Sequence, residues 1–445
     1  MGKIQDDSYL YSIVYNIVKF AFKKFFRQIE VHGKSNIPKN EPVIFAPNHQ
    51  SGLMDPLSVI LNQEEPIVFL TRADIFNGKV FNGLFRFLKM MPVYRIRDGY
   101  ESLSKNEEQF NVAKDVLVEN KKLCVMPEGN HGNQHKLRPL VKGIFRIAFS
   151  TEELLEKEAH VRIIPVSLDY NFFQHAGADL VVRYGKPIKV EDYLPLYLEN
   201  QANGFNTMRN DLSDILSEMM HDIRSTDNYD LIYNLCCYLT PSFLENSVKN
   251  DNDLYKTRAG KNFFARKAIG KILDVLDKDG SEYIVQFEKL TKNINKLPGY
   301  PSERTDLMEF TPGITTCFMN LILSVISIPG ILINLPALIL SWFFCKKIKD
   351  KQMHNTYAFV VGLFLFPIVY LIVSIVIAST LGYGFVKALI LLLIISTIGI
   401  IGERLRQFQR IPFRHLIYSF GKRKKMLLNA RKDYERLKQT FKKFH

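Results

Sequence analysis

The stretch FAPNHQSGLMDP, residues 45–56, places a histidine and an aspartate directly after an apolar run. A helix is expected to begin near Ser51, so that Asp55 lies about one turn into it and its carboxylate reaches back to His49. Such a contact would fix the imidazole tautomer and leave the second ring nitrogen to accept a proton from a hydroxyl. The pair therefore suggests general base catalysis. The alternative is that Asp55 helps to cap the helix and His49 belongs to an ordinary polar turn.

A second polar stretch, CVMPEGNHGNQHKLRPLVKG over residues 124–143, follows another apolar run. Its strand leads into Glu128 and Gly129, and a basic loop then leads to a helix expected at Gly143. Glycines with free backbone N–H groups, basic side chains and a helix N-terminus together favour an anion such as phosphate. An ordinary solvated loop is the alternative. The basic residues of this loop are Lys136, Arg138 and Lys142.

The stretch MMPVYRIRDG, residues 90–99, places Arg95 at the end of a further short strand. A guanidinium group can bind phosphate through two parallel hydrogen bonds, which makes Arg95 a candidate phosphate ligand. Taken by itself, Arg95 is equally consistent with an arginine on the surface.

These residues need a scaffold, and residues 35–190 alternate β-rich runs with helical patterns. This alternation is typical of an α/β domain, here expected over residues 31–202 as a mixed sheet flanked by helices. Helices are expected over 101–119 and 142–157. Strands are expected over 42–46, 66–70, 91–94, 122–126, 161–170 and 179–185.

The rest of the chain is polar and largely helical over 203–310, a region to which the sequence assigns no role, and then becomes strongly apolar. Runs of this length nearly free of charge predict membrane segments rather than core helices. Residues 403–445 are expected to form a basic cytoplasmic tail. The three apolar runs are 313–345, 357–379 and 384–402.

Lysines and arginines predict the orientation of these segments. The basic stretches 345–354 and 403–410 should both face the cytoplasm, so the two apolar runs between them cross the membrane as a pair. Run 313–345 must then begin and end on the cytoplasmic side if the soluble domain is cytoplasmic. Because Pro329-Gly330 and Pro336 interrupt this run, we expect a re-entrant hairpin of two short helices, with a single span as the alternative.

The N-terminal stretch SYLYSIVYNIVKFAFKKFFRQ, within residues 1–30, mixes aromatic and aliphatic residues with four basic ones. The pattern suits an amphipathic helix lying in the lipid interface. The alternative is an amphipathic helix packed on the domain. The basic residues are Lys19, Lys23, Lys24 and Arg27.

Composition limits the partners. The chain has 445 residues with 59 Lys and Arg against 45 Asp and Glu, a net charge of +14, which favours an anionic partner such as nucleic acid, anionic lipid or a phosphorylated substrate. Its five cysteines have no C-x-x-C or Cys/His metal spacing. We therefore expect reduced thiols, no disulfide framework and no metal site.

Four stretches, taken in order, resemble the four motifs of the glycerolipid acyltransferase family. They are the block from Asn48-His49 to Asp55, Arg95 in MPVYR, Glu128-Gly129 in MPEG, and Pro165 in IIPV. The family includes 1-acylglycerol-3-phosphate acyltransferases, glycerol-3-phosphate acyltransferases and tafazzin. The resemblance covers roughly residues 35–190.

The resemblance implies a membrane-bound enzyme of phospholipid biosynthesis. It would transfer a fatty acyl group from a thioester, acyl-CoA or an acyl carrier protein, to a hydroxyl of glycerol-3-phosphate or 1-acylglycerol-3-phosphate. His49 would act as general base and Asp55 would orient it, with no nucleophilic side chain because a thioester is already activated. The substrate-binding residues would be Arg95, Glu128, Gly129, Asn130, His131 and Lys142.

The resemblance implies no cofactor besides the thioester co-substrate, no metal and no nucleic-acid partner. It places the enzyme among membrane lipids, as a multi-pass protein of the cell membrane with its catalytic domain on the cytoplasmic side. The acceptor, the donor carrier, the acyl chain length and the oligomeric state stay open.

Three departures from the family motifs concern the acceptor more than the chemistry. Five residues rather than four separate His49 from Asp55. Asn130 and His131 stand where the family usually has Thr and Arg, and Lys89 stands where it often has Gly.

Two other classes of protein remain as alternatives, a lipid-binding or remodelling protein with a vestigial site and a transporter. The transporter lacks its usual marks, because Lys387 is the only ionisable residue that interrupts the apolar runs.

Overall fold

The computed structural model describes residues 3–6, 8–76, 79–94, 105–155, 159–173, 176–247, 255–348, 350 and 353–444. The chain forms two compact units. The first comprises Met1–Lys24, Ile29–Tyr170 and Leu180–Asp222, and the second comprises Phe25–Gln28, Asn171–Asp179 and Ile223–His445.

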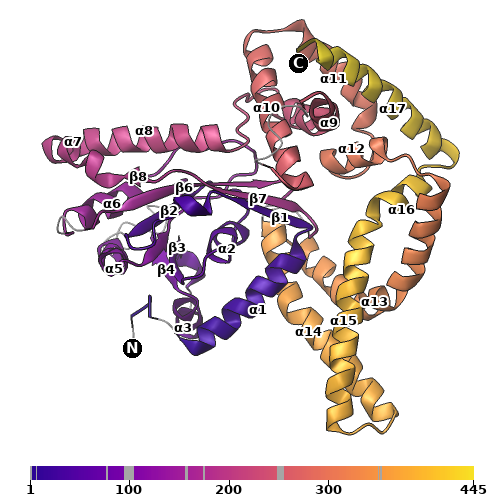
Figure 1. Ribbon diagram of the computed structural model, residues 1–445, viewed down its shortest axis with the longest axis horizontal. Helices are drawn as coiled ribbons and strands as arrows, with labels where there is room; N and C mark the ends of the chain where they lie inside the picture. Colours follow the sequence, from indigo (N-terminus) through magenta and orange to yellow (C-terminus); the bar gives the residue numbers. More distant parts are fainter. Residues whose placement is uncertain are drawn as a thin grey trace. The chain divides into compact units, whose positions relative to one another are not determined.

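The first unit is built on a mixed sheet that, within the described residues, has eight strands in the order β1-β7-β6-β2-β5-β3-β4, with β8 also paired to β6 (Figure 1). Strands β6, β2, β5, β3 and β4 run parallel to one another. Strands β7 and β8 run antiparallel to β6. The predicted α/β fold is confirmed. The strands are β1 Gln28–His32, β2 Val43–Pro47, β3 Ile67–Arg72, β4 Met90–Val93, β5 Lys122–Cys124, β6 Arg162–Tyr170, β7 Asp179–Tyr184 and β8 Ile188–Lys189.

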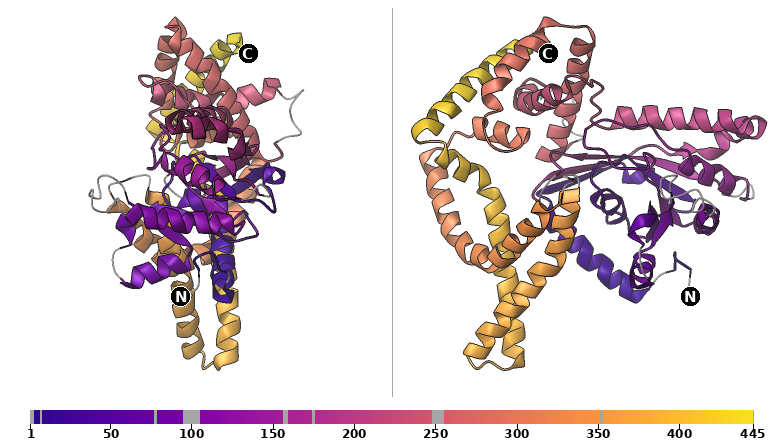
Figure 2. Two further views of the ribbon diagram at one scale, coloured as in Figure 1. Left: turned by 90° about the vertical axis from the view of Figure 1, so that its left-hand side faces the viewer. Right: turned by 180° about the vertical axis from the view of Figure 1, so that it is seen from behind.

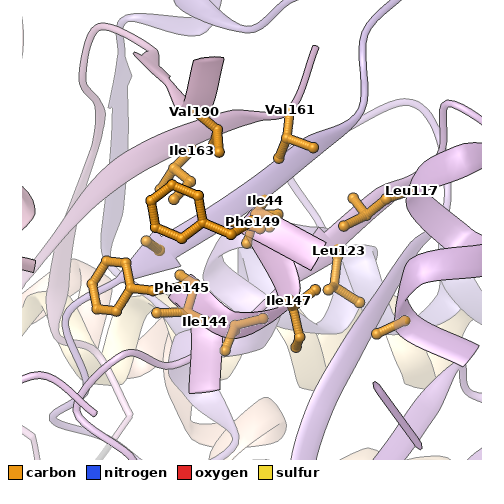
Figure 3. Packing of buried hydrophobic residues seen from close by; sticks show 14 of the residues in the cluster. Ile44, Leu117, Leu123, Ile144, Phe145, Ile147, Phe149, Val161, Ile163 and Val190 are labelled. Atoms are coloured by element: carbon orange, nitrogen blue, oxygen red, sulfur yellow. The ribbon is translucent and has the colours of Figure 1, made fainter. Parts of the chain in front are cut away.

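Helices cover both faces of this sheet. Ile44 lies in register with Leu123 on β5 and with Ile163 on β6, and these three fully buried side chains meet Phe145 and Phe149 (Figure 3). Side chains alternate between the faces of a strand, and α2 packs against β2 and β6. The helices of this unit are α1 Tyr9–Phe25, α2 Met54–Ile60, α3 Lys79–Phe87, α5 Lys105–Val118, α6 Gly143–Glu152, α7 Leu194–Glu199 and α8 Gln201–Met219.

The six predicted strands are confirmed to within two residues at each end. Strands β1 and β8 were not predicted, because β1 follows an amphipathic helix without a turn signal and β8 has only two residues. The first unit also extends to Asp222, beyond the expected boundary at residue 202. Helix α8 explains the extension, since its Met208, Leu212 and Leu216 are fully buried in the core of the sheet.

Parallel strands bring their carboxyl ends to one edge of a sheet, which is where ligands bind in such folds. The carboxyl ends of β2, β4 and β5 therefore lie at one edge, and the segments with His49 and Glu128 follow two of these strands.

Helix α1 has two sets of apolar side chains, one buried and one exposed. Tyr11 and Phe22 are buried, and the Tyr15 hydroxyl donates to the Gln63 carbonyl oxygen at 2.5 Å. The helix therefore packs on the first unit, as one alternative expected. It also exposes a second set of large apolar side chains, and their contact with a lipid interface stays a prediction. This set is Tyr9, Leu10, Ile13, Ile17 and Phe20.

The second unit contains a helical core to which distant parts of the chain contribute. Its members come from α9 Tyr229–Ser247, α10 Arg258–Lys278, α11 Glu282–Ile294, α12 Pro301–Glu309 and α17 Gly421–Phe441. Helix α17 lies in the segment expected to be a basic tail. It is instead packed, because an apolar residue recurs every three or four positions among its lysines and arginines. The buried residues of α17 are Leu427, Ala430, Tyr434, Leu437 and Phe441.

Three helices of the described chain are long and apolar enough to cross a membrane: α13 Ile314–Lys346, α14 His354–Thr380 and α15 Phe385–Phe408 (Figures 1 and 2). The expected break of the first apolar run into two helices is not observed, since α13 continues through both Pro329 and Pro336. The number of crossings and the sidedness of the loops stay predictions.

Where α13 continues through its two prolines, it packs closely against α15. A Cβ atom on Gly330 would lie 2.6 Å from the Cα atom of Gly402, so the two helices approach where neither has a side chain. One turn later, the Asn334 side chain donates to the carbonyl oxygen of Gly399 at 2.8 Å. Neighbouring helices of this kind support a proline within a membrane helix, so α13 need not end there.

Candidate active site

The turn between β2 and α2 carries the predicted catalytic pair, and Asn48 anchors it. The Asn48 amide donates to the carbonyl oxygen of Leu168 at 3.1 Å, and its oxygen accepts the Leu168 N–H at 2.7 Å. Both hydrogen bonds are fully buried, so water does not compete for these groups. Asn48 therefore fixes the start of the turn to the neighbouring strand β6.

Asp55 is the centre of the turn. Its Oδ2 atom accepts hydrogen bonds from the backbone N–H of Gln50 at 2.6 Å and of Ser51 at 2.7 Å, and lies 2.8 Å from Nδ1 of His49. Its Oδ1 atom accepts the hydroxyl of Tyr170 at 2.7 Å. A fully buried carboxylate with four donors is well compensated for the loss of water. The His49–Asp55 contact forms although five residues, rather than the four usual in the family, separate the two. Helix α2 begins at Met54 and not near Ser51 as expected, so the extra residue is accommodated in the turn before the helix.

His49 is held for proton transfer. Since Asp55 accepts from Nδ1–H, the remaining nitrogen Nε2 is the one that can accept a proton. The His49 side chain keeps 13% of its surface exposed, whereas Asp55 has none. The pair thus combines a fixed, sealed carboxylate with an imidazole that remains accessible from outside. This is the geometry expected of a general base and the residue that orients it.

Tyr170 belongs to this site although the sequence did not single it out. It is the last residue of β6. Its hydroxyl donates to Asp55 and also lies 3.0 Å from the hydroxyl of Ser58. Burial, together with the nearby Asp55 carboxylate, raises the pKa of Tyr170 far above its ordinary value, so the hydroxyl remains a donor. A polar residue at the end of a strand that carries a motif was the available signal.

Glu128 joins the two polar stretches. Its Oε1 accepts the backbone N–H of His49 at 2.6 Å, and its Oε2 accepts that of Arg138 at 3.1 Å. Burial raises the pKa of Glu128 to about 7, and the two backbone N–H groups oppose this rise. Both oxygens thus hold the loop backbone. A contact of Glu128 with substrate stays a prediction.

The loop after Glu128 is a network of turns. Gly129 has φ of +66°, a conformation that favours glycine, and its N–H donates to the Met126 carbonyl oxygen at 3.1 Å. The Gly132 N–H donates to the His49 carbonyl oxygen at 2.9 Å. The expected free N–H groups of these glycines are therefore used within the loop, because tight turns close with such bonds. An anion would need the side chains instead.

Arg138 organises the two residues that depart from the family motif. One of its guanidinium nitrogens, Nη1, donates to the carbonyl oxygens of Asn130 and His131, both at 2.9 Å. The ring of His131 packs edge-on against that of His49, with 5.6 Å between centroids. The structure thus brings His131 to the catalytic pair, and Arg138 fixes the backbone of Asn130 beside it. Lys142 lies exposed directly before α6.

The second predicted motif is described only in part. Arg95 lies outside the described residues, so its role as a phosphate ligand stays a prediction. Lys89, where the family often has glycine, has φ of +58°, a conformation that costs about 1–2 kcal/mol for a residue with a Cβ. Its ammonium group donates to the carbonyl oxygens of Ile4 and Asp6 at 3.2 and 2.6 Å, which compensates this cost.

Residues 28–169, which include His49, Asp55 and Glu128 but end one residue before Tyr170, match the family model described as Acyltransferase. Among solved structures, the chain is similar to the 1-acyl-sn-glycerophosphate (LPA) acyltransferase PlsC from Thermotoga maritima, with 19% sequence identity and a TM-score of 0.35. That similarity covers 47% of this chain and 78% of the other, and at this TM-score it carries no argument about function. No curated protein matches the chain.

Proposed function

Because residues 28–169 match the Acyltransferase family model, we propose that the chain is a glycerolipid acyltransferase, with the following reaction and substrates. It transfers a fatty acyl group from acyl-CoA or acyl carrier protein to a hydroxyl of a glycerol-phosphate acceptor. The acceptor is glycerol-3-phosphate or its 1-acyl derivative. The reaction serves phospholipid biosynthesis at a membrane.

The contact of 2.8 Å between Nδ1 of His49 and Oδ2 of Asp55 carries this proposal. Three further donors fix the carboxylate, so the imidazole is oriented before substrate binds. A residue that is held in position in this way avoids reorganisation during the reaction. A vestigial domain would have no reason to keep such a contact.

In the proposed reaction, Nε2 of His49 removes the proton from the acceptor hydroxyl as its oxygen attacks the thioester carbonyl carbon. The tetrahedral intermediate then collapses, the carbon–sulfur bond breaks, and the leaving thiolate takes the proton from His49. The products are an ester and a free thiol. Asp55 stabilises the imidazolium that forms between the two steps.

The acceptor's phosphate is proposed to meet the basic loop rather than backbone N–H groups. Asn130, His131 and Lys142 supply side chains there, and Arg95 adds a guanidinium from the end of the second motif. The carboxylate of Glu128 has the wrong charge to bind phosphate. Its proposed contribution, together with the turn at Gly129, is to hold this loop against the His49 backbone.

The membrane setting is proposed from α13, α14 and α15 and from the exposed apolar face of α1. Lipid substrates and products suit an enzyme anchored in this way. The catalytic domain is proposed to face the cytoplasm, together with the basic flanks of α14 and α15. This topology requires that α14 and α15 cross the membrane as a pair and that α13, although one continuous helix, does not cross it.

Thiol labelling in intact cells tests this orientation. With Cys317 and Cys345 replaced by alanine, a Tyr383→Cys variant should react with an impermeant maleimide, whereas a Lys347→Cys variant should react only after lysis. Tyr383 is exposed in the turn between α14 and α15. Labelling of Lys347→Cys in intact cells would mean that α13 crosses the membrane once and that the cytoplasmic assignment of its C-terminal end is wrong.

The enzymatic proposal is tested with full-length protein purified in detergent. Glycerol-3-phosphate and its 1-acyl derivative are offered side by side with acyl-CoA, and thiol release and ester product are measured together. We expect equimolar thiol and ester with one of the two acceptors. His49→Ala should lower the rate about a hundred- to ten-thousand-fold.

His160→Ala is the matched control, because His160 also contacts a carboxylate, Glu152, at 2.6 Å but lies outside this turn. It should keep the wild-type rate. Retention by His49→Ala of more than about a tenth of that rate would exclude base catalysis of the expected size by this residue. Thiol release without ester would indicate a thioesterase instead.

A further inference from the structure

Three residues that no short motif connects lie together in the first unit. His135 lies in the loop between β5 and α6, Asp169 is the penultimate residue of β6, and His221 follows the end of α8. One ligand atom from each lies within 4.8 Å of the other two. All three residues are buried, with at most 2% of their surface exposed.

The distances in this cluster suit a shared ion. Nδ1 of His135 lies 3.4 Å from Oδ1 of Asp169, beyond the usual range for an N–H···O hydrogen bond. Two ligands about 2.1 Å from a tetrahedral zinc ion are separated by about 3.4 Å. The rings of His135 and His221 have centroids 5.1 Å apart and are tilted by 37°, so they do not stack.

A second group of the same residue types shows the contrast. Glu152, His160 and Glu191 also approach one another, but only Glu152 of the three is buried. Glu152 receives His160 at 2.6 Å and the Val161 N–H at 2.7 Å, and Glu191 forms an ion pair with Arg162. His160 and Glu191 are also partly exposed. Hydrogen bonds and ion pairs account for this group.

We propose that His135, Asp169 and His221 bind a divalent transition-metal ion, with zinc the best match to the nitrogen and oxygen ligands. Two neutral imidazoles and one carboxylate form a donor set that first-row metals accept, and they leave a fourth position for a further ligand. The ion neutralises a carboxylate that is buried away from solvent, which is otherwise costly. Sequence spacing does not reveal the site because its ligands are 34 and 52 residues apart.

The position of the cluster suggests what the ion does. Side chains alternate along a strand, so Asp169 points to the opposite face of β6 from its neighbour Tyr170, which contacts Asp55. Beside His135, the Gln134 carbonyl oxygen accepts from the Gln50 side chain at 3.2 Å, and the Leu137 N–H donates to Asp222 at 2.9 Å. The ion thus joins the loop that carries Glu128 to β6 and to the end of α8.

The test uses the full-length protein in detergent. It is loaded with zinc chloride, freed of loosely held metal by gel filtration, and analysed by mass spectrometry of the metal. We expect equimolar zinc in the wild type and in His160→Gln, and more than about tenfold less in His135→Gln and in His221→Gln. Removal of zinc by a chelator should lower the Tm of the wild type, and added zinc should restore it.

Cobalt loading of the wild type keeps the proposal testable if the variants fail to fold. Cobalt should give visible absorption typical of tetrahedral nitrogen and oxygen ligands, and zinc should abolish it. Zinc retained equally by the wild type and by both cluster variants would overturn the proposal, as adventitious metal. Absence of both zinc and cobalt binding by the folded wild type would also overturn it and leave an ordinary buried contact between His135 and Asp169.

Discussion

Strand β6 has a histidine and a carboxylate near each of its faces, and the two groups differ in access. On one face, Asp55 accepts hydrogen bonds from four donors, and the His49 side chain beside it is 13% exposed. On the other face, Asp169 lies 3.4 Å from His135, and both side chains are only 2% exposed. The same residue types are therefore accessible from the surface in one case and sealed from it in the other.

This difference shows that residue type alone does not assign a role. An imidazole can act as a base only when its free nitrogen reaches a substrate, which requires exposure and a fixed tautomer. A sealed pair with a longer separation suits an ion or a structural contact. The burial of the histidine and the number of donors on the carboxylate distinguish the two cases.

Matched Asp→Asn substitutions test this distinction most strongly. Asp55→Asn presents an amide to Nδ1 of His49 and no longer selects the tautomer, so kcat should fall about a thousand- to ten-thousand-fold. Asp169→Asn should retain most of the acyltransferase rate and lose bound zinc. Both variants are assayed at saturating acceptor, with circular dichroism as the check on folding.

A comparable loss of kcat in both variants, with the fold intact, would contradict a division of labour between the two faces of β6. Retained activity in Asp55→Asn would show that His49 does not need a carboxylate on Nδ1 to act as the base.

Glu128 gives the next effect, one that depends on pH. Its pKa of about 7 lies above the ordinary 4.5, so between these values the folded protein binds more protons than the unfolded chain. Stability is therefore greatest below pH 4.5, as far as this group is concerned, and falls as the pH rises to about 7, by roughly 3 kcal/mol. Glu128→Gln does not titrate, so its stability should depend less on pH over this window.

Thermal unfolding in detergent, measured from pH 4.5 to 8, checks this prediction. At low pH the protonated Glu128 and a glutamine each offer one strong carbonyl acceptor to the N–H groups of His49 and Arg138, so the Tm values of the two proteins should differ least there. Equal slopes of Tm against pH in the two proteins would assign the dependence to other groups.

The sheet was predictable because its strands are short β-rich runs separated by turns and helices. Asn48 to Asp55 and Glu128 were predictable because motif residues at strand ends converge on one edge of a parallel sheet. The membrane helices followed from length and apolarity. These signals are local, because each is contained in one continuous segment of the chain.

What the sequence did not reveal depends on contacts between distant segments. Tyr170 reaches Asp55 across 115 residues, and Arg138 supports Asn130 and His131 through backbone carbonyls that have no sequence signature. The use of the Gly129 and Gly132 N–H groups within turns likewise needed coordinates. The expected break at Pro329 was wrong because contacts with the neighbouring helix α15, which the pattern of one segment does not contain, support the helix there.

Tyr170→Phe should produce the smallest effect and makes the finest test of how Asp55 is held. The substitution removes only the hydroxyl that donates to Oδ1, while the three donors on Oδ2 remain. Loss of one hydrogen bond to a charged group costs about 1.5–2 kcal/mol, so kcat should fall about ten- to thirtyfold if that bond helps to orient the pair. KM for the acceptor should change little, because Tyr170 is fully buried and does not meet substrate.

Tyr184→Phe, on the neighbouring strand β7, is the control. The buried hydroxyl of Tyr184 accepts a hydrogen bond from the Gln63 side chain at 2.9 Å and does not contact Asp55. An equal fall of kcat in Tyr170→Phe and Tyr184→Phe would assign the effect to packing around β6 rather than to the orientation of Asp55.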